Sequence, residues 1–166
     1  MPTAAPVTTQ SGGGAVTGMP PDLSSMTPVE AADRLFNRVM TAVAAGDSTE
    51  AQQFMPMAIA AYDRARPLNT DGLFHLSMLQ RTAMQLEAAL VTAREILEAN
   101  SDHLLGLSAA AKAAVELGRS DIAAVYYERV LDVYESQIEQ DIPEYVEHAP
   151  ITDNLRSEAE AFLSGR

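Results

Sequence analysis

The chain twice carries the same spacing of residues that could bind a ligand, Asp-x-x-Phe-x-x-x-Met. Each set has one carboxylate, one aromatic ring and one thioether: Asp33, Phe36, Met40 and Asp71, Phe74, Met78. Steps of three and four residues place the side chains of each set on one face of a helix. Two Phe and two Met would form an adaptable apolar strip, which suits a partner helix or an extended peptide. The alternative is that the strip packs inside the core, as apolar residues at helical spacing usually do.

Catalytic chemistry finds little support in the sequence. The three histidines, His75, His103 and His148, lie far apart, and none has a His partner four residues away with a Glu beside it. The chain has no G-x-S-x-G motif and no Gly-rich phosphate loop. We interpret His103, which follows Asp102 at a helix start, as a solvated turn residue. No catalytic, cofactor-binding or metal-binding residue is predicted, and an enzyme is the least favoured class.

Composition narrows the class of protein further. The chain has 166 residues, which is room for one compact domain. Its 23 acidic and 11 basic residues give a net charge of −12, which argues against a nucleic-acid partner because such proteins neutralise phosphates with Lys and Arg. The absence of Cys excludes disulfides and zinc sites built on thiolates. An apolar fraction of 47% with only 5% aromatic residues suits closely packed, Ala-rich helices.

The segment between Glu135 and Glu160 is strongly acidic. It holds eight acidic residues and one basic residue, Arg156. Three interpretations stay open: a solvated acidic face, a docking patch for a basic partner, and a weak divalent-cation site. The solvated face is the favoured one.

Residues 1–26 are almost entirely Pro, Thr, Ser, Gly, Ala and Val, and they contain one charged residue, Asp22. Such a segment buries too little apolar surface to offset chain entropy, so we expect a flexible linker to an upstream segment or a plain tail. The features of a signal peptide are missing, and no run of about 18 apolar residues occurs. We therefore expect no membrane insertion and, by default, a cytoplasmic location.

Residues 27–166 form the predicted domain, and its first helix begins at Thr27. Thr27 can act as the N-cap, Pro28 suits the first helical position, and Glu30 can complete a capping box. Apolar residues then recur at helical spacing: Ala32, Leu35, Phe36, Val39, Met40 and Val43. Gly46 ends this helix, and Ser48 is predicted to cap the next.

The second helix is predicted to run to about residue 66, with Pro56 kinking it or delaying its start. Further helices are expected at roughly 70–84, 86–99, 103–117 and 120–140. Residues 142–150 are predicted to be irregular, and Thr152 or Asp153 to cap a last helix ending near Leu163. No segment alternates with the period of a strand, so the predicted fold class is all-α.

The helices recur in pairs with a period of 34 residues. Leu73 and Leu107 are 34 residues apart, as are Ala89 and Ala123. Helix–turn–helix units of this length resemble tetratricopeptide repeats. The third unit matches best, through Leu107, Ala110, Ala111, Ala114, Gly118, Ala123, Tyr127 and Val130. The second matches through Leu73, Leu76, Ser77, Ala89, Ala93 and Ile96, and the first, more loosely, through Leu35, Val39, Ala42, Gly46, Ala51, Met55 and Ala58.

The resemblance covers about residues 32–135 and has clear departures. The aromatic residue of the first packing position, and the Gly that usually follows it, are missing from all three units. The small residue at the helix crossing is present in each, as Ala51, Ala89 and Ala123.

The resemblance implies a right-handed solenoid of three helix pairs with a C-terminal capping helix. An apolar stripe would pack that helix on the stack: Ile151, Leu155, Ala159, Phe162 and Leu163. Its polar side would carry Arg156, Glu158 and Glu160.

The family's concave groove falls on eight residues here: Asp33, Phe36, Met40, Asp71, Phe74, Met78, Arg81 and Lys112. Chaperone-binding members clamp a peptide carboxylate with cationic groove residues, and here Asp33 and Asp71 would repel one. The resemblance therefore implies a non-catalytic scaffold for a protein or peptide, amphipathic and with basic residues. A self-assembling homo-oligomer is the alternative, and no cofactor and no nucleic acid are expected.

Overall fold

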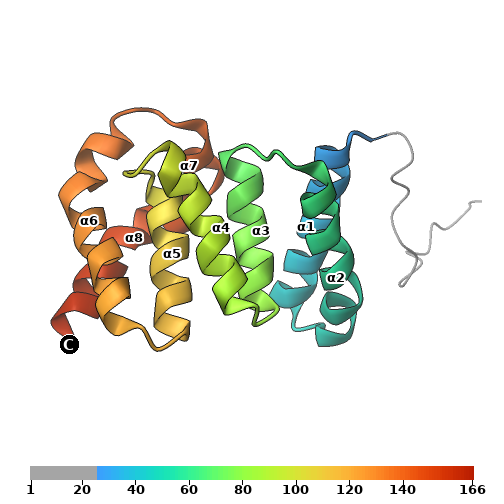
Figure 1. Cartoon of the computed structure of the whole chain (residues 1–166), viewed down its shortest axis with the longest axis horizontal. Coiled ribbons are helices and arrows are strands. Elements are labelled where there is room, and N and C mark those ends of the chain that lie inside the picture. The colour runs from blue at the N-terminus through green and yellow to red at the C-terminus, as the bar shows by residue number, and fades with distance from the viewer. Residues whose placement is uncertain (1–25) are drawn as a thin grey trace, which may run out of the picture.

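The computed structural model describes residues 26–166, and all regular structure in that part of the chain is helical (Figure 1). Eight helices occur there: α1 (Pro28–Ala45), α2 (Ser48–Ala65), α3 (Thr70–Thr82), α4 (Leu86–Ala99), α5 (Leu104–Glu116), α6 (Ser120–Ile138), α7 (Pro143–Glu147) and α8 (Ala149–Ser164). The predicted all-α class is confirmed. Except for Met26, the linker predicted for residues 1–26 lies outside the described residues. Within the described range, no helix is both long and apolar enough to span a bilayer.

The first two helices begin at capping residues close to those predicted, but the predicted N-cap of α2 was wrong. The predicted capping box is present: Glu30 donates its backbone N–H to the Thr27 hydroxyl at 3.3 Å, and the Glu30 carboxylate accepts from the Thr27 N–H at 2.8 Å. Asp47, and not Ser48, caps α2, because the Asp47 carboxylate accepts from the Glu50 N–H at 3.0 Å. Ser48 is instead the first helical residue.

Pro56 lies inside α2 and does not delay its start, which is at Ser48. Proline removes one backbone hydrogen bond from a helix interior. Phe54 and Ala58 on either side of it are buried at 1% and 0% exposure, so packing holds the helix together across the proline.

The C-terminal region also starts earlier than predicted. Residues 142–150 are not irregular, because α7 and the start of α8 lie within them. Each of these helices has a proline in its first turn, where a missing N–H costs nothing. Thr152 is therefore not a cap: it is 1% exposed and donates its hydroxyl to the Tyr145 carbonyl oxygen at 2.9 Å.

Consecutive helices pack in antiparallel pairs, α1 with α2, α3 with α4 and α5 with α6, as the sequence predicted (Figure 1). The small residues of the predicted crossings, Ala51, Ala89 and Ala123, are 6%, 0% and 0% exposed. Two clusters of buried side chains make up the core. One joins α1, α2 and α3, the other joins α3 to α8, and Leu68 and Met78 pack against both.

Helix α8 packs along α6 and crosses α5. The Tyr134 hydroxyl donates to the Thr152 carbonyl at 3.0 Å, and the Tyr127 hydroxyl donates to the Glu158 carboxylate at 2.6 Å. The whole predicted apolar stripe packs into or against the core. The prediction for Glu158 was wrong, because it lies one turn from Leu155 on the inward face and pairs with Lys112 at 3.1 Å.

Gly106 marks a close approach of α4 and α5. A Cβ atom built there would lie 2.8 Å from both Ile96 Cγ2 and Leu97 Cδ2 and 3.1 Å from Ile96 Cβ. Real Cβ atoms essentially never come that close, so the Ile96 and Leu97 side chains, or the helices that carry them, would have to move.

Replacing Gly106 with Ala is therefore expected to destabilise the protein by about 1–3 kcal/mol through overpacking. In a domain of this size the melting temperature should fall by about 2–4 °C for each kcal/mol. Thermal unfolding followed by circular dichroism measures the change. Gly165→Ala is the control, since its nearest contact is the Ala161 carbonyl at 3.4 Å. Equal melting curves for the two variants would contradict the close approach.

Deleting residues 151–166 is expected to lower the melting temperature and promote association, because it uncovers the apolar side of α6. Leu155 is 0% exposed. Burial of one such side chain contributes about 1.5–3 kcal/mol. Calorimetry and light scattering test the two effects. An unchanged melting curve with a monomeric truncated chain would show that α8 is not a cap.

Candidate functional site

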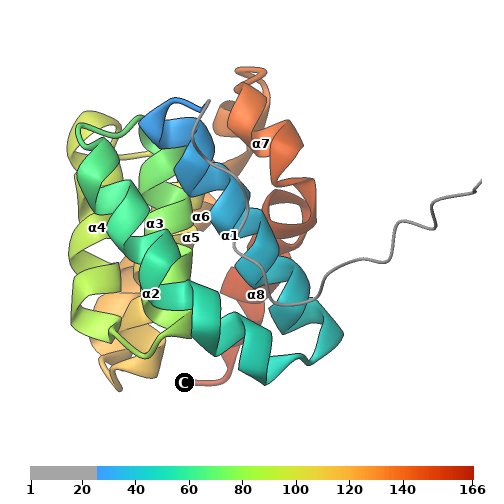
Figure 2. The same ribbon diagram turned by 90° about the vertical axis from the view of Figure 1, so that its right-hand side faces the viewer.

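The predicted groove residues lie on α1, α3 and α5, the first helix of each pair. Asp33, Phe36 and Met40 are on α1, Asp71, Phe74, Met78 and Arg81 are on α3, and Lys112 is on α5. Figure 2 shows α2 and α4 on one side of the molecule and α7 and α8 on the other, with α1 between them. Part of the predicted groove therefore faces the protein's own C-terminal segment.

Helix α8 covers the part of the predicted groove that α3 and α5 contribute. Phe74, Met78, Lys112 and Ile151 line a residual cavity of about 20 Å³ there. Phe74 is 2% exposed, whereas Met78 stays partly exposed. With Ile151 of α8 as one wall, the space that remains there is too small for a partner side chain.

The α1 part of the strip is less covered. Phe36 is 7% exposed and stacks on the His75 ring, with 3.9 Å between the ring centroids. Met40 is partly exposed, and the Asp33 side chain is 38% exposed. The aromatic residues of both sets thus belong to the core, while Met40 and Asp33 reach the surface.

Both predicted groove cations have partners within the chain. Arg81 lies 2.7 Å from the Glu116 carboxylate, and Lys112 lies 3.1 Å from that of Glu158. Each of these side chains is thus already engaged with a carboxylate of the chain itself.

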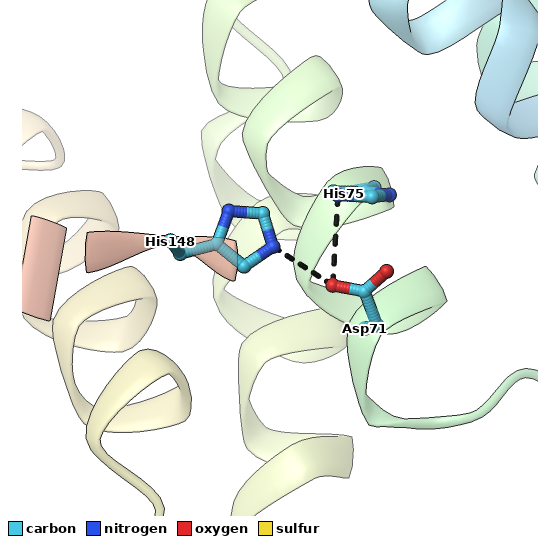
Figure 3. A group of neighbouring side chains, drawn as sticks. All are labelled: Asp71, His75 and His148. Carbon is cyan, nitrogen blue, oxygen red and sulfur yellow. Dashed lines mark hydrogen bonds and ion pairs between the residues drawn. The ribbon is translucent and has the colours of Figure 1, made fainter. Parts of the chain in front are cut away.

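The structure brings together three residues that sequence analysis did not connect: Asp71, His75 and His148 (Figure 3). Asp71 and His75 are one turn apart on α3, and His148 lies at the junction of α7 and α8. Asp71 Oδ1 is 2.8 Å from His148 Nε2 and 3.6 Å from His75 Nε2. We call this group the Asp–His cluster.

A second layer orients His75. Tyr62 is fully buried, donates its hydroxyl to Asp33 Oδ1 at 2.6 Å and lies 3.0 Å from His75 Nδ1. The tyrosine has one proton and gives it to Asp33, so it accepts a hydrogen bond from the His75 Nδ1–H. In the neutral ring, Nε2 then carries a lone pair on the side of Asp71.

Burial sets the charge state of the cluster. It lowers the pKa of His75 below its usual value, more strongly than the neighbouring carboxylate of Asp71 raises it, so the ring is neutral at pH 7. Burial alone would raise the pKa of Asp71, but the hydrogen bond from His148, together with the positive charge that the two imidazoles carry when protonated, brings it below its usual value. Asp71 is therefore ionised.

Aromatic rings confine the cluster without sealing it. Phe36 stacks on His75, and the edge of Phe74 meets His148 with 4.8 Å between the centroids. The side chains of Asp71, His75 and His148 are 22%, 11% and 15% exposed, so water reaches them. Two imidazoles and one carboxylate form a donor set for a divalent metal.

A local signal for part of this cluster is present in the sequence. Asp71 and His75 stand at i and i+4, which places them on one helical face, although this Asp–His pair does not fit the metal motif of two histidines four residues apart. His148 carries no such signal, because it is 77 residues from Asp71.

The interpretation of His103 as a solvated turn residue was wrong. It is 5% exposed, and its Nδ1 is a buried nitrogen without a hydrogen-bond partner among the described residues. Its ring packs on Tyr145, whose hydroxyl accepts from the Leu104 N–H at 2.9 Å. Because α5 has no side-chain N-cap, Tyr145 of α7 supplies the missing acceptor and covers His103.

No protein-family model matches the chain, and no curated protein matches it either. The assignment of a function therefore depends on the sequence and on the geometry described above.

Replacing Tyr62 with Phe is expected to destabilise the protein by about 1–3 kcal/mol, because it removes a buried hydroxyl on which Asp33 and His75 both depend. Chemical unfolding measures the loss. The control is Tyr126→Phe, whose hydroxyl accepts from Arg94 at an exposed site and should change stability by no more than about 0.5 kcal/mol. Equal stability of the two variants would show that the Tyr62 hydroxyl does not support the cluster.

Proposed function

We propose that this chain is a non-catalytic interaction module of the tetratricopeptide-repeat type, binding an amphipathic helix or peptide along α1, on the part of the α1, α3 and α5 face that α8 leaves uncovered. The period of 34 residues and the packing in sequential pairs support the repeat. One observation carries the binding proposal: a helix of the chain itself, α8, already lies against this face.

The contacts of α8 indicate what the face accepts. Ile151 fills the space beside Phe74 and Met78, as an apolar anchor would. His148 contacts Asp71, and Glu158 pairs with Lys112. A helix with apolar residues on one side and polar groups at the edges is therefore chemically compatible with this surface.

A second helix or peptide would lie beside α8, along α1. Met40 would provide the apolar contact and Asp33 the charge. A protein with a net charge of −12 attracts basic partners over a long range, so a partner with Lys or Arg next to its apolar anchors is favoured.

Apolar contact would supply most of the affinity. Burial of a large apolar side chain contributes about 1.5–3 kcal/mol, whereas an exposed charge pair contributes about 0–1 kcal/mol. Asp33 would therefore act mainly on the rate of association, with an effect that decreases as salt rises.

A self-assembling homo-oligomer is the second candidate. It is favoured by a cavity of about 380 Å³ between α1 and α2, lined by Leu35, Pro56, Met57 and Ala60 among others. Met57 is 40% exposed there. Light scattering after size exclusion separates the candidates, because a concentration-independent monomer contradicts self-assembly.

Affinity capture with the full chain, followed by mass spectrometry, tests the interaction module. Met40→Glu should abolish capture of a specific partner, because it places a charge in the apolar strip. Val125→Glu is the matched control, since Val125 is 62% exposed on α6, away from the strip. A partner retained equally by both variants would show that the α1 part of the face does not bind it.

A further inference from the structure

We propose that Asp71, His75 and His148 bind one divalent transition-metal ion of the zinc type, and that this ion fastens the α7–α8 segment to α3. The proposal does not depend on the proposed function. It rests on the geometry of the Asp–His cluster and on the second layer behind His75 (Figure 3).

The donors have the chemistry and spacing that zinc requires. Zinc in a catalytic-type site takes three protein ligands at about 2.0–2.2 Å and keeps a fourth position for water. Donor atoms around such an ion are about 3.3 Å apart in tetrahedral geometry. The two distances from Asp71 Oδ1 to the imidazole nitrogens, 2.8 and 3.6 Å, lie on either side of that value. One donor atom from each of the three residues lies within 4.8 Å of the others, so small side-chain rotations would close the set.

His75 already has the orientation of a metal ligand. Its Nδ1–H is held by Tyr62, and Asp33 Oδ1 lies 3.4 Å from the same nitrogen. A zinc-bound histidine usually donates its far N–H to a carboxylate, a backbone carbonyl or water, which fixes the tautomer and raises the basicity of the ligating nitrogen. Here the Tyr62 hydroxyl takes the place of that acceptor.

The contact between His75 and Asp71 is poorly satisfied without a cation. The lone pair of Nε2 and the carboxylate of Asp71 are both acceptors, and 3.6 Å separates them. A metal ion between them would turn two facing acceptors into two ligands. His148 donates its Nε2–H to Asp71 in the absence of metal, and it becomes a ligand by carrying its proton on Nδ1 instead.

The ion would close a long loop of the chain. His148 is 77 residues from Asp71 and lies where α7 meets α8. Metal binding at this point holds the start of α8 over Phe74, so it stabilises the covered state of the α3–α5 surface.

Zinc titration of the chelator-treated full chain tests the proposal. Calorimetry should give one ion per chain. The ring-nitrogen NMR signals of His75 and His148 should move to metal-bound positions, whereas those of His103 should not move. His103 is the internal control, because all three histidines of the chain are then observed in one experiment. Amide hydrogen exchange in α7 and α8 should slow on zinc addition.

His148→Gln should weaken zinc binding at least about tenfold, because it removes one of three protein ligands. Tyr62→Phe should weaken it about 10–100-fold through the second layer. Glu147→Gln is the control: it removes an exposed carboxylate next to the site and should leave the affinity unchanged.

The proposal is overturned if the wild-type ring nitrogens of His75 and His148 do not respond to zinc, or if His103 responds equally. Several weakly bound ions per chain, bound with the same affinity by His148→Gln, would also overturn it. Such a result would indicate that zinc binds to scattered surface carboxylates instead. If His148→Gln fails to fold by circular dichroism, the wild-type NMR titration decides alone.

Discussion

Tyr145 of α7 makes two buried hydrogen bonds on which the C-terminal half of the molecule depends. Its hydroxyl accepts from the Leu104 N–H and donates to Gln137 Oε1, both at 2.9 Å. The first bond supplies an acceptor for the uncapped start of α5, where an unpaired buried N–H would cost about 1–3 kcal/mol. Because Tyr145 is fixed between α5 and α6, the chain leaves α7 directed towards α3, and His148 arrives beside Asp71.

The direction in which the chain leaves α7 decides which helix faces stay uncovered. A terminal helix that only capped α6 would leave the face of α3 and α5 open. Here α8 crosses α5, and Ile151 contacts the cavity next to Phe74. The two Asp-x-x-Phe-x-x-x-Met sets therefore serve two purposes. Their Phe residues belong to the core. Their Asp residues lie beside His75: Asp33 is linked to it through Tyr62, and Asp71 belongs to the Asp–His cluster.

Sequence predicted what local chemistry controls. The Thr27 capping box and the Gly46 break follow from neighbours within a few residues, and both predictions are confirmed. The three alanines predicted at helix crossings from the 34-residue period, Ala51, Ala89 and Ala123, are buried. Sequence failed where contacts are distant. His103 was expected in solvent, but Tyr145, far along the chain, covers it. The miss at Glu158 is of another kind, because a local signal was available: its three-residue spacing from Leu155 puts it on the inward face, where it pairs with Lys112. The Asp–His cluster needed a contact across 77 residues, which no local pattern encodes.

One segment links the proposed metal site with the proposed binding face. His148 completes the cluster, and three residues later Ile151 covers the strip. By thermodynamic linkage, a partner that displaced α8 would weaken metal binding by the same factor by which the metal weakens that partner. A partner that lies along α1, beside Met40, leaves His148 in place and is free of this coupling. The affinity of a partner that displaces α8 thus depends on the metal, whereas the affinity of a partner along α1 does not. The dependence arises at Asp71, because this residue contacts both His75 of α3 and His148 at the start of α8.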